Sequence, residues 1–336
     1  MAWFLRISRK RGEPFYWATA SLGLLLVLLL LACGGGELVA SPATGDPLGM
    51  PSTTLAMPTV TEVPAPSSKG DLLAFSSGES IYVMSLADNS TKRVTDGYSP
   101  SLSPSGREVA YCKDRNIWVV DIEGKMPSLL AEVFYRDPVE SCSLGAASVV
   151  WSPDGRFIVY NRSRTGGSGI SEVWVMDREG KKSTRLLQSS AFLLPSWVGA
   201  NQIAVYQGPG REGGIITLLS VDGQEQMVIP TQLQRAALSA QKSPREDVWL
   251  LGPIIPVLEG GDILVGSEGT WDVIAQGLNP IWSPDGERIA FIHDEAIWIM
   301  REDGSDKYQL VNLDLLEGRP KGRMPLVSSF LSWVAP

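Results

Sequence analysis

Trp151-Ser-Pro-Asp-Gly155 recurs as Trp282-Ser-Pro-Asp-Gly286, and Leu102-Ser-Pro-Ser-Gly106 is a near copy. Three degenerate copies keep only part of the pattern: Trp197-Val-Gly-Ala-Asn201, Lys242-Ser-Pro-Arg-Glu246 and Trp333-Val-Ala-Pro336. Successive copies lie 40 to 51 residues apart. One β-propeller blade takes about 40–45 residues, so the repeat predicts an all-β, six-bladed propeller.

The residues that follow each clear copy have the pattern of a blade. Proline presets φ at the first corner of the turn, and Asp-Gly supplies a polar cap and a permissive backbone. Two strands rich in β-branched and aromatic residues come next, as expected where both faces of a sheet pack on neighbouring blades. In three blades the second of these strands contains a tryptophan that we expect in the core: Trp118, Trp174 and Trp298.

This pattern resembles the TolB-like propellers, which are related to WD-repeat proteins. The resemblance runs from about residue 71 to 336, and the two complete Ser-Pro-Asp-Gly turns are its most specific feature. The chain has a low-complexity segment where TolB itself has an additional α/β domain. The resemblance implies a propeller over residues 70–336, with the last blade split between the two ends. Residues 327–333 would form its innermost strand, and 72–75, 80–85 and 91–95 the other three, so that no sheet edge stays open.

The first 32 residues have the features of an export signal. Arg6 to Arg11 is basic, and residues 15–32 are apolar. Leu30-Leu-Ala-Cys33-Gly resembles a bacterial lipobox, which implies cleavage before Cys33 and a lipid, such as palmitate, on its thiol. The alternative is an uncleaved transmembrane helix over 15–32, since this length can span a bilayer. Both readings place the rest of the chain outside the cytoplasm.

Residues 33–69 are rich in Pro, Ser, Thr and Ala and are predicted to form a disordered linker.

The whole chain carries a net charge of −8. Removal of residues 1–32, with four basic side chains and one acidic, leaves the mature protein at −11. An acidic domain is repelled by nucleic acid and by anionic headgroups, so we expect neither as a partner.

The long connections of the predicted propeller gather on one face, where loops between the second and third strands meet those between blades. Loops longer than the minimum often carry function, although drift in unconstrained loops would look the same. Mixed charge with aromatic residues suits a protein or peptide partner. The candidate binding residues are Phe134, Tyr135, Arg136, Arg162, Arg164, Arg211, Glu212, Glu259 and Asp262.

Few residues suggest catalysis or metal binding. The single histidine, His293, is insufficient for a histidine-based zinc site and is expected at the edge of a blade. Cys112 and Cys142 are expected on the same face of adjacent blades, where an oxidising compartment allows a disulfide or two separate thiols. No nucleophile elbow or phosphate-binding loop is present. We expect no cofactor and no metal.

These observations predict a monomeric, membrane-tethered lipoprotein of the bacterial cell envelope. Its propeller would bind an envelope or extracellular protein through the long loops. The alternative is a carbohydrate- or peptide-binding propeller, or a lyase or hydrolase, with a site at the channel mouth. Convergent titratable side chains in the channel would favour an enzyme.

Overall fold

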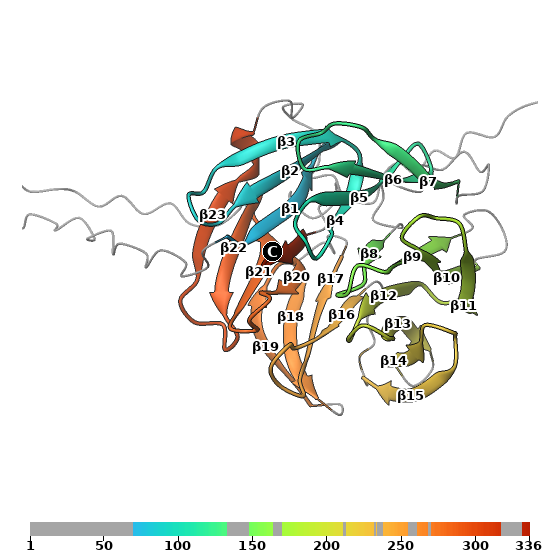
Figure 1. Cartoon of the computed structure of the whole chain (residues 1–336). Coiled ribbons are helices and arrows are strands. Elements are labelled where there is room, and N and C mark those ends of the chain that lie inside the picture. Colours follow the sequence, from blue (N-terminus) through green and yellow to red (C-terminus); the bar gives the residue numbers. More distant parts are fainter. Residues whose placement is uncertain are drawn as a thin grey trace, which may run out of the picture. The chain divides into compact units, whose positions relative to one another are not determined.

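The computed structural model describes residues 70–132, 148–163, 170–210, 213–231, 233, 238–254, 261–267, 270–316 and 331–336. These residues form six four-stranded antiparallel sheets, each a blade (Figure 1). Adjacent blades contact one another through their inner strands, and the sixth returns to contact the first. The expected six-bladed propeller is confirmed.

The blades are numbered from the one that contains the start of the described chain, and their strands are given from the innermost outwards. Blades 1 to 3 are β24 (Leu331–Val334), β1 (Leu72–Ser77), β2 (Ser80–Ser85), β3 (Thr91–Asp96); β4 (Tyr98–Leu102), β5 (Glu108–Lys113), β6 (Asn116–Asp121), β7 (Ser128–Glu132); and β8 (Val149–Trp151), β9 (Phe157–Ser163), β10 (Ser171–Asp177), β11 (Ser183–Ser189).

Blades 4 to 6 follow the same order without a split. They are β12 (Leu193–Trp197), β13 (Gln202–Gly210), β14 (Gly213–Ser220), β15 (Glu225–Pro230); β16 (Leu238–Lys242), β17 (Trp249–Pro253), β18 (Asp262–Ser267), β19 (Thr270–Gln276); and β20 (Leu278–Trp282), β21 (Arg288–His293), β22 (Ala296–Arg301), β23 (Tyr308–Asn312). A 3-10 turn, η1 (Leu313–Leu315), follows β23.

Blade 1 joins the two ends of the described chain. The C-terminal strand β24 pairs antiparallel with β1, with Leu73 opposite Trp333 and Phe75 opposite Leu331. The expected inner strand at 327–333 is thus found at Leu331–Val334, and residues 327–330 lie outside the described part of the chain. Closing the ring in this way pairs the edge of β1 that would otherwise be open.

The hydrophobic core is divided into six main clusters, one at each interface between neighbouring blades. The cluster between blades 1 and 2, for example, includes Ile81 and Tyr111, and the one between blades 6 and 1 includes Phe75 and Ile297. Strands 1 to 3 of a blade therefore bury both faces, which explains their continuous apolar runs. Trp118, Trp174 and Trp298 are half-buried and pack against the margins of these clusters.

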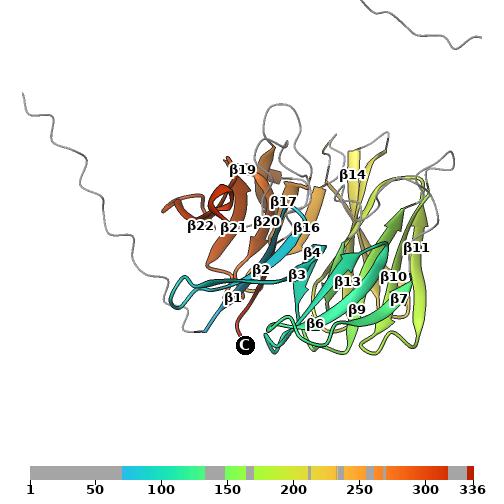
Figure 2. The ribbon, with the colours of Figure 1, turned by 90° about the horizontal axis from the view of Figure 1, so that it is seen from above.

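The two ends of the ring differ, and we name them by their connections. The turn face carries the turns between strands 1 and 2 and between strands 3 and 4 of each blade, such as Ser152–Gly155 and Asp121–Gly124. The loop face carries the turns between strands 2 and 3 and the connections between blades. Pro336 lies beside Gly106 in a turn of blade 2, so the C-terminus is at the turn face (Figure 2).

Candidate functional site

The repeated Ser-Pro-Asp-Gly segment folds into a hydrogen-bonded turn at the turn face. The Ser152 hydroxyl donates to Asp154 Oδ1 over 2.7 Å and accepts from the Phe157 N–H over 2.9 Å. Burial raises the pKa of the Asp154 carboxyl, but hydrogen bonds from Ser152 and Arg156 outweigh it and leave the pKa below its ordinary value. The turn of Ser283 and Asp285 has the same contacts. Both aspartates therefore stabilise their turns by accepting hydrogen bonds within them.

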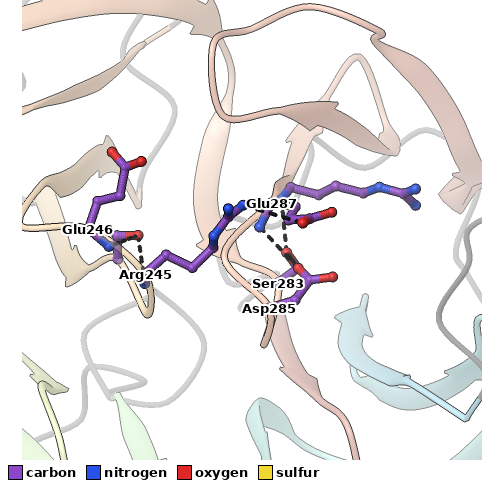
Figure 3. A network of polar contacts seen from close by, with 7 residues as sticks. Arg245, Glu246, Ser283, Asp285 and Glu287 are labelled. Carbon is purple, nitrogen blue, oxygen red and sulfur yellow. Dashed lines mark hydrogen bonds and ion pairs between the residues drawn. The ribbon is translucent and has the colours of Figure 1, made fainter.

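Neighbouring blades are linked across the turn face by polar side chains. Arg245, in the turn of blade 5, reaches over to Glu287 in the turn of blade 6, where Arg245 Nη1 lies 3.4 Å from Glu287 Oε1 (Figure 3). Arg178 of blade 3 binds Glu108 of blade 2 at 2.7 Å in the same manner. Exposed pairs of this kind contribute about 0–1 kcal/mol each, so these links add little to the stability of the ring.

The innermost strands of all six blades surround a central cavity of about 500 Å³. Its lining forms levels of equivalent residues, one from each blade. One level consists of Pro100, Val149, Pro195, Ala240, Pro280 and Leu331, and the next of Ser101, Val150, Ser196, Gln241, Ile281 and Ser332. At the first of these levels, proline therefore occurs in every second blade. Proline is tolerated because the inner edge of these strands has no neighbour in the sheet.

Polar side chains of the second level bridge adjacent blades. Ser332 Oγ accepts from the Leu102 N–H over 2.9 Å, and Ser101 Oγ accepts from the Trp151 N–H over 3.0 Å. Gln241 Oε1 lies 3.4 Å from the Trp282 N–H that donates to it. Each bridge satisfies a backbone group on the inner edge of the next strand. We call these contacts the inner bridges.

The loop face is uneven around the ring. Blades 1, 2 and 6 connect their second and third strands by two residues only, namely 78–79, 114–115 and 294–295. The corresponding connections of blades 3 and 5 span seven and eight residues. Blade 4 has no long loop at this place, because β13 and β14 continue through a register shift between Gln207 and Gly210 and leave only residues 211–212 between them.

Arg162, one of the expected binding residues, lies within blade 3 in a charge cluster around the buried carboxylate of Glu172. Its Nε is 3.0 Å from Glu172 Oε2, and Arg185 Nη1 lies 3.1 Å from the other oxygen of this carboxylate. The Arg162 guanidinium also stacks 5.0 Å from the Trp174 ring. Burial raises the pKa of the neighbouring Tyr160 hydroxyl to about 12. Arg162 is therefore engaged inside the blade, and its role in binding stays a prediction.

The other expected residues are not brought together. Asp262, at the start of β18 in blade 5, accepts a hydrogen bond from Gln276 and is two blades away from Arg162. His293 ends β21, and its Nε2 lies 3.3 Å from the exposed Asp294. The remaining candidates lie outside the described residues: Phe134, Tyr135, Arg136, Arg164, Arg211, Glu212, Glu259 and the lipid-attachment residue Cys33.

Cys112 is completely buried near the end of β5 and is disulfide-bonded. Its partner is not among the described residues, and Cys142 lies outside them, between β7 and β8 in the sequence. The pairing of Cys112 with Cys142 stays a prediction.

The described residues contain no group of three or more His, Cys, Asp or Glu side chains that could hold a metal ion. The cavity lining, within the same ranges, has no acidic side chain, and its one charged residue is Lys242. Lys242 Nζ is 2.8 Å from Asp247 Oδ1, an exposed carboxylate. In the described part of the chain there is also no helix with the length and hydropathy to span a bilayer.

Sequence reasoning missed the cavity residues, although a signal for them exists. The position before the repeated tryptophan is Ser or Gln in four of the six copies: Ser101, Ser196, Gln241 and Ser332. A polar residue that recurs inside otherwise apolar strands indicates a specific bridging role. The alternation of Pro100, Pro195 and Pro280 is equally visible in the aligned repeats.

The comparisons with known proteins agree on the fold. No protein-family model and no curated protein matches the sequence. Among solved structures, TolB from Acinetobacter baumannii matches with a TM-score of 0.57 at 15% identity, over 80% of this chain and 67% of that one. A TolB from Agrobacterium tumefaciens, described as putative, matches at 0.52 and 13%, over 72% and 88%. A chain of the nidogen/laminin complex matches at 0.54 and 11%, over 79% and 98%. The chain thus has a TolB-like propeller fold.

Proposed function

We propose that this protein is a membrane-tethered lipoprotein, outside the cytoplasm, whose propeller binds another protein through the loop face of blades 3, 4 and 5. The observation that carries the proposal is the asymmetry of the loop face. Blades 6, 1, 2 and 4 connect their second and third strands by two residues, but in blade 4 these strands are longer and form an extended hairpin, and in blades 3 and 5 the connections span seven and eight residues. Long loops on a rigid scaffold are a common way to build a binding surface.

The position of the N-terminal end of the described chain supports the same surface. Asp71 leads into β1 at the turn face, where its carbonyl oxygen accepts from the Leu86 N–H over 2.9 Å. The described chain thus begins at the end of the ring opposite the proposed binding surface. One chain of similar fold belongs to a complex named for two proteins, nidogen and laminin, so such a propeller is compatible with protein binding.

Two experiments test the proposal. Cys33→Ala should abolish incorporation of labelled palmitate and leave the chain at the mass of the uncleaved precursor, whereas a wild-type protein that carries no palmitate and keeps residues 1–32 would favour the transmembrane alternative. For partner binding, the connections at 164–169 and 255–260 are shortened, and the product is compared with wild type by crosslinking in host cells. We expect one reproducible crosslinked protein to be lost.

The matched control for the loop variants changes the opposite face. Arg245→Ala with Glu246→Ala removes two side chains from the turn face (Figure 3). This variant should keep the crosslinked partner if the loop face is the binding surface. Loss of the partner in the control but not in the loop variants would place binding on the turn face and overturn the proposal.

A further inference from the structure

The central cavity has the size of a ligand site. Its volume of about 500 Å³ falls in the range of small-molecule pockets, about 300–1,000 Å³. The lining continues from the inner strands to Pro104, Pro153, Pro244 and Pro284 in the turns, so the cavity reaches the turn face.

The described lining is electrically almost neutral. It contains no Asp or Glu, and the charge of Lys242 is paired with the exposed Asp247. An ion that entered would lose hydration without meeting an opposite charge, which is costly. The lining thus disfavours both metal ions and anionic ligands.

The backbone edges around the cavity have few available donors. The Leu102 N–H points toward the cavity, as its bond to Ser332 shows. The strand repeats every two residues, so the backbone N–H two positions earlier points the same way. That earlier position is proline in blades 2, 4 and 6, namely Pro100, Pro195 and Pro280, so its N–H is missing. The inner bridges occupy further N–H groups, at Leu102, Trp151 and Trp282. An added peptide strand would need these donors, so the inner edges are poorly suited to strand pairing.

Asn279 adds an unusual polar group to this lining. It is 4% exposed, and its Oδ1 has no hydrogen-bond partner in the structure. Its backbone has a φ of +48°, a left-handed conformation that asparagine tolerates. A buried amide oxygen without a partner costs about 1–3 kcal/mol, and a ligand hydroxyl that donates a hydrogen bond to it would recover this cost.

We propose that the central cavity binds a small, neutral, polyhydroxylated molecule of the size of a monosaccharide. Hydroxyl groups of such a ligand bond to polar groups of the lining, among them the Asn279 amide. Its C–H faces pack against the proline, valine and leucine side chains of the first level. This ligand class matches a nearly neutral and partly apolar cavity with few free backbone donors, where an ion or a peptide strand fits poorly.

The experiment compares neutral polyols with charged derivatives of glucose. The full mature protein, in a detergent without a sugar headgroup, is titrated with glucose, glucosamine and glucuronate, and with galactose, mannose and myo-inositol as further neutral probes. Binding is followed by saturation-transfer NMR and by tryptophan fluorescence. At least one neutral probe should bind saturably with a Kd of about 1 mM or below, and the charged analogues of a bound sugar about tenfold more weakly. Absence of saturable binding by all four neutral probes overturns the proposal, as does tighter binding of a charged analogue.

Variants at two equivalent positions locate the ligand. Asn279→Gly removes the amide while glycine accepts the positive φ, and we expect the affinity to fall about fivefold. The matched control is Ser99→Gly, at the corresponding bulge of blade 2, where φ is +52° but the side chain does not contact the cavity. The control should retain the wild-type affinity. Equal effects of the two variants, with both proteins folded by circular dichroism, would exclude Asn279 from the site and overturn the assignment.

Discussion

Trp333 Nε1 donates a hydrogen bond to Asp71 Oδ2 over 2.9 Å, although the two residues are 262 positions apart in the chain. Both residues are at most 9% exposed. The bond lies where β24 pairs with β1, so it ties the two ends of the described chain together in blade 1. Ring closure therefore depends on a small number of contacts between residues from opposite ends.

Trp333→Ala should destabilise the whole propeller. The substitution removes a buried indole from the cluster between blades 6 and 1 and breaks the bond to Asp71. Such changes typically cost about 3–5 kcal/mol. Urea denaturation measures this loss, with Met227→Ala as the control because Met227 is exposed on β15. A loss for Trp333→Ala no larger than that of the control would contradict a structural role for the closure.

Asp71→Asn should change how stability depends on pH. Burial raises the pKa of the Asp71 carboxyl above its ordinary value, although the bond from Trp333 opposes the shift. A group with a raised folded-state pKa stabilises the fold below the unfolded pKa, and this contribution is lost as pH rises through the folded pKa. Asparagine still accepts from Trp333 but carries no charge.

We therefore expect the Asp71→Asn protein to melt at a higher temperature than wild type at pH 7. The difference should shrink as the pH falls below the ordinary pKa of an aspartate, where the wild-type carboxyl is protonated. Melting curves across this pH range test the prediction. A constant decrease of Tm at every pH would show that the carboxylate is preferred over the amide in this position.

The inner bridges should contribute measurably to stability. Ser101→Ala leaves the Trp151 N–H without its acceptor inside the ring, and an orphaned buried donor costs about 1–3 kcal/mol. Ser305→Ala, in an exposed turn of blade 6, is the control and should change the free energy of unfolding by less than about 0.5 kcal/mol. If both variants have the same stability, water replaces the serine hydroxyl at no cost.

The remaining prediction concerns the cysteines. A disulfide between Cys112 and Cys142 should appear as a linked peptide in a digest of the unreduced protein. Cys142→Ser should then lower the free energy of unfolding by about 2–4 kcal/mol. Recovery of both residues as free thiols from protein handled without reductant would rule the pairing out.

The repeats predicted the architecture because each blade is built from local patterns. The Ser-Pro-Asp-Gly turn makes its hydrogen bonds within a few residues, as Ser152, Asp154 and Phe157 show. The apolar runs of the strands follow directly from burial on both faces. At the C-terminal end, the strand expected at 327–333 is described from Leu331 to Val334, one residue beyond the expected end.

The features that sequence reasoning missed depend on contacts between distant residues. The bridge from Ser332 to Leu102 spans most of the propeller in sequence, and no local pattern indicates its partner. Arg162 looked like a loop charge because it follows an apolar strand, yet the pairing of β9 with β10 places it against Glu172. The extended hairpin of blade 4 was not predicted because it contains several glycines, and glycines usually mark a loop.

The shared first blade also determines how the chain could be rearranged. Leu72 lies opposite Val334 in the closing pair of strands, so a short Gly/Ser linker could join the C-terminus to the start of β1. New ends could then be opened in an exposed turn, such as the one at Asp303. In this circular permutant every blade would be covalently continuous except the one that was cut, and the noncovalent seam would move to another part of the ring.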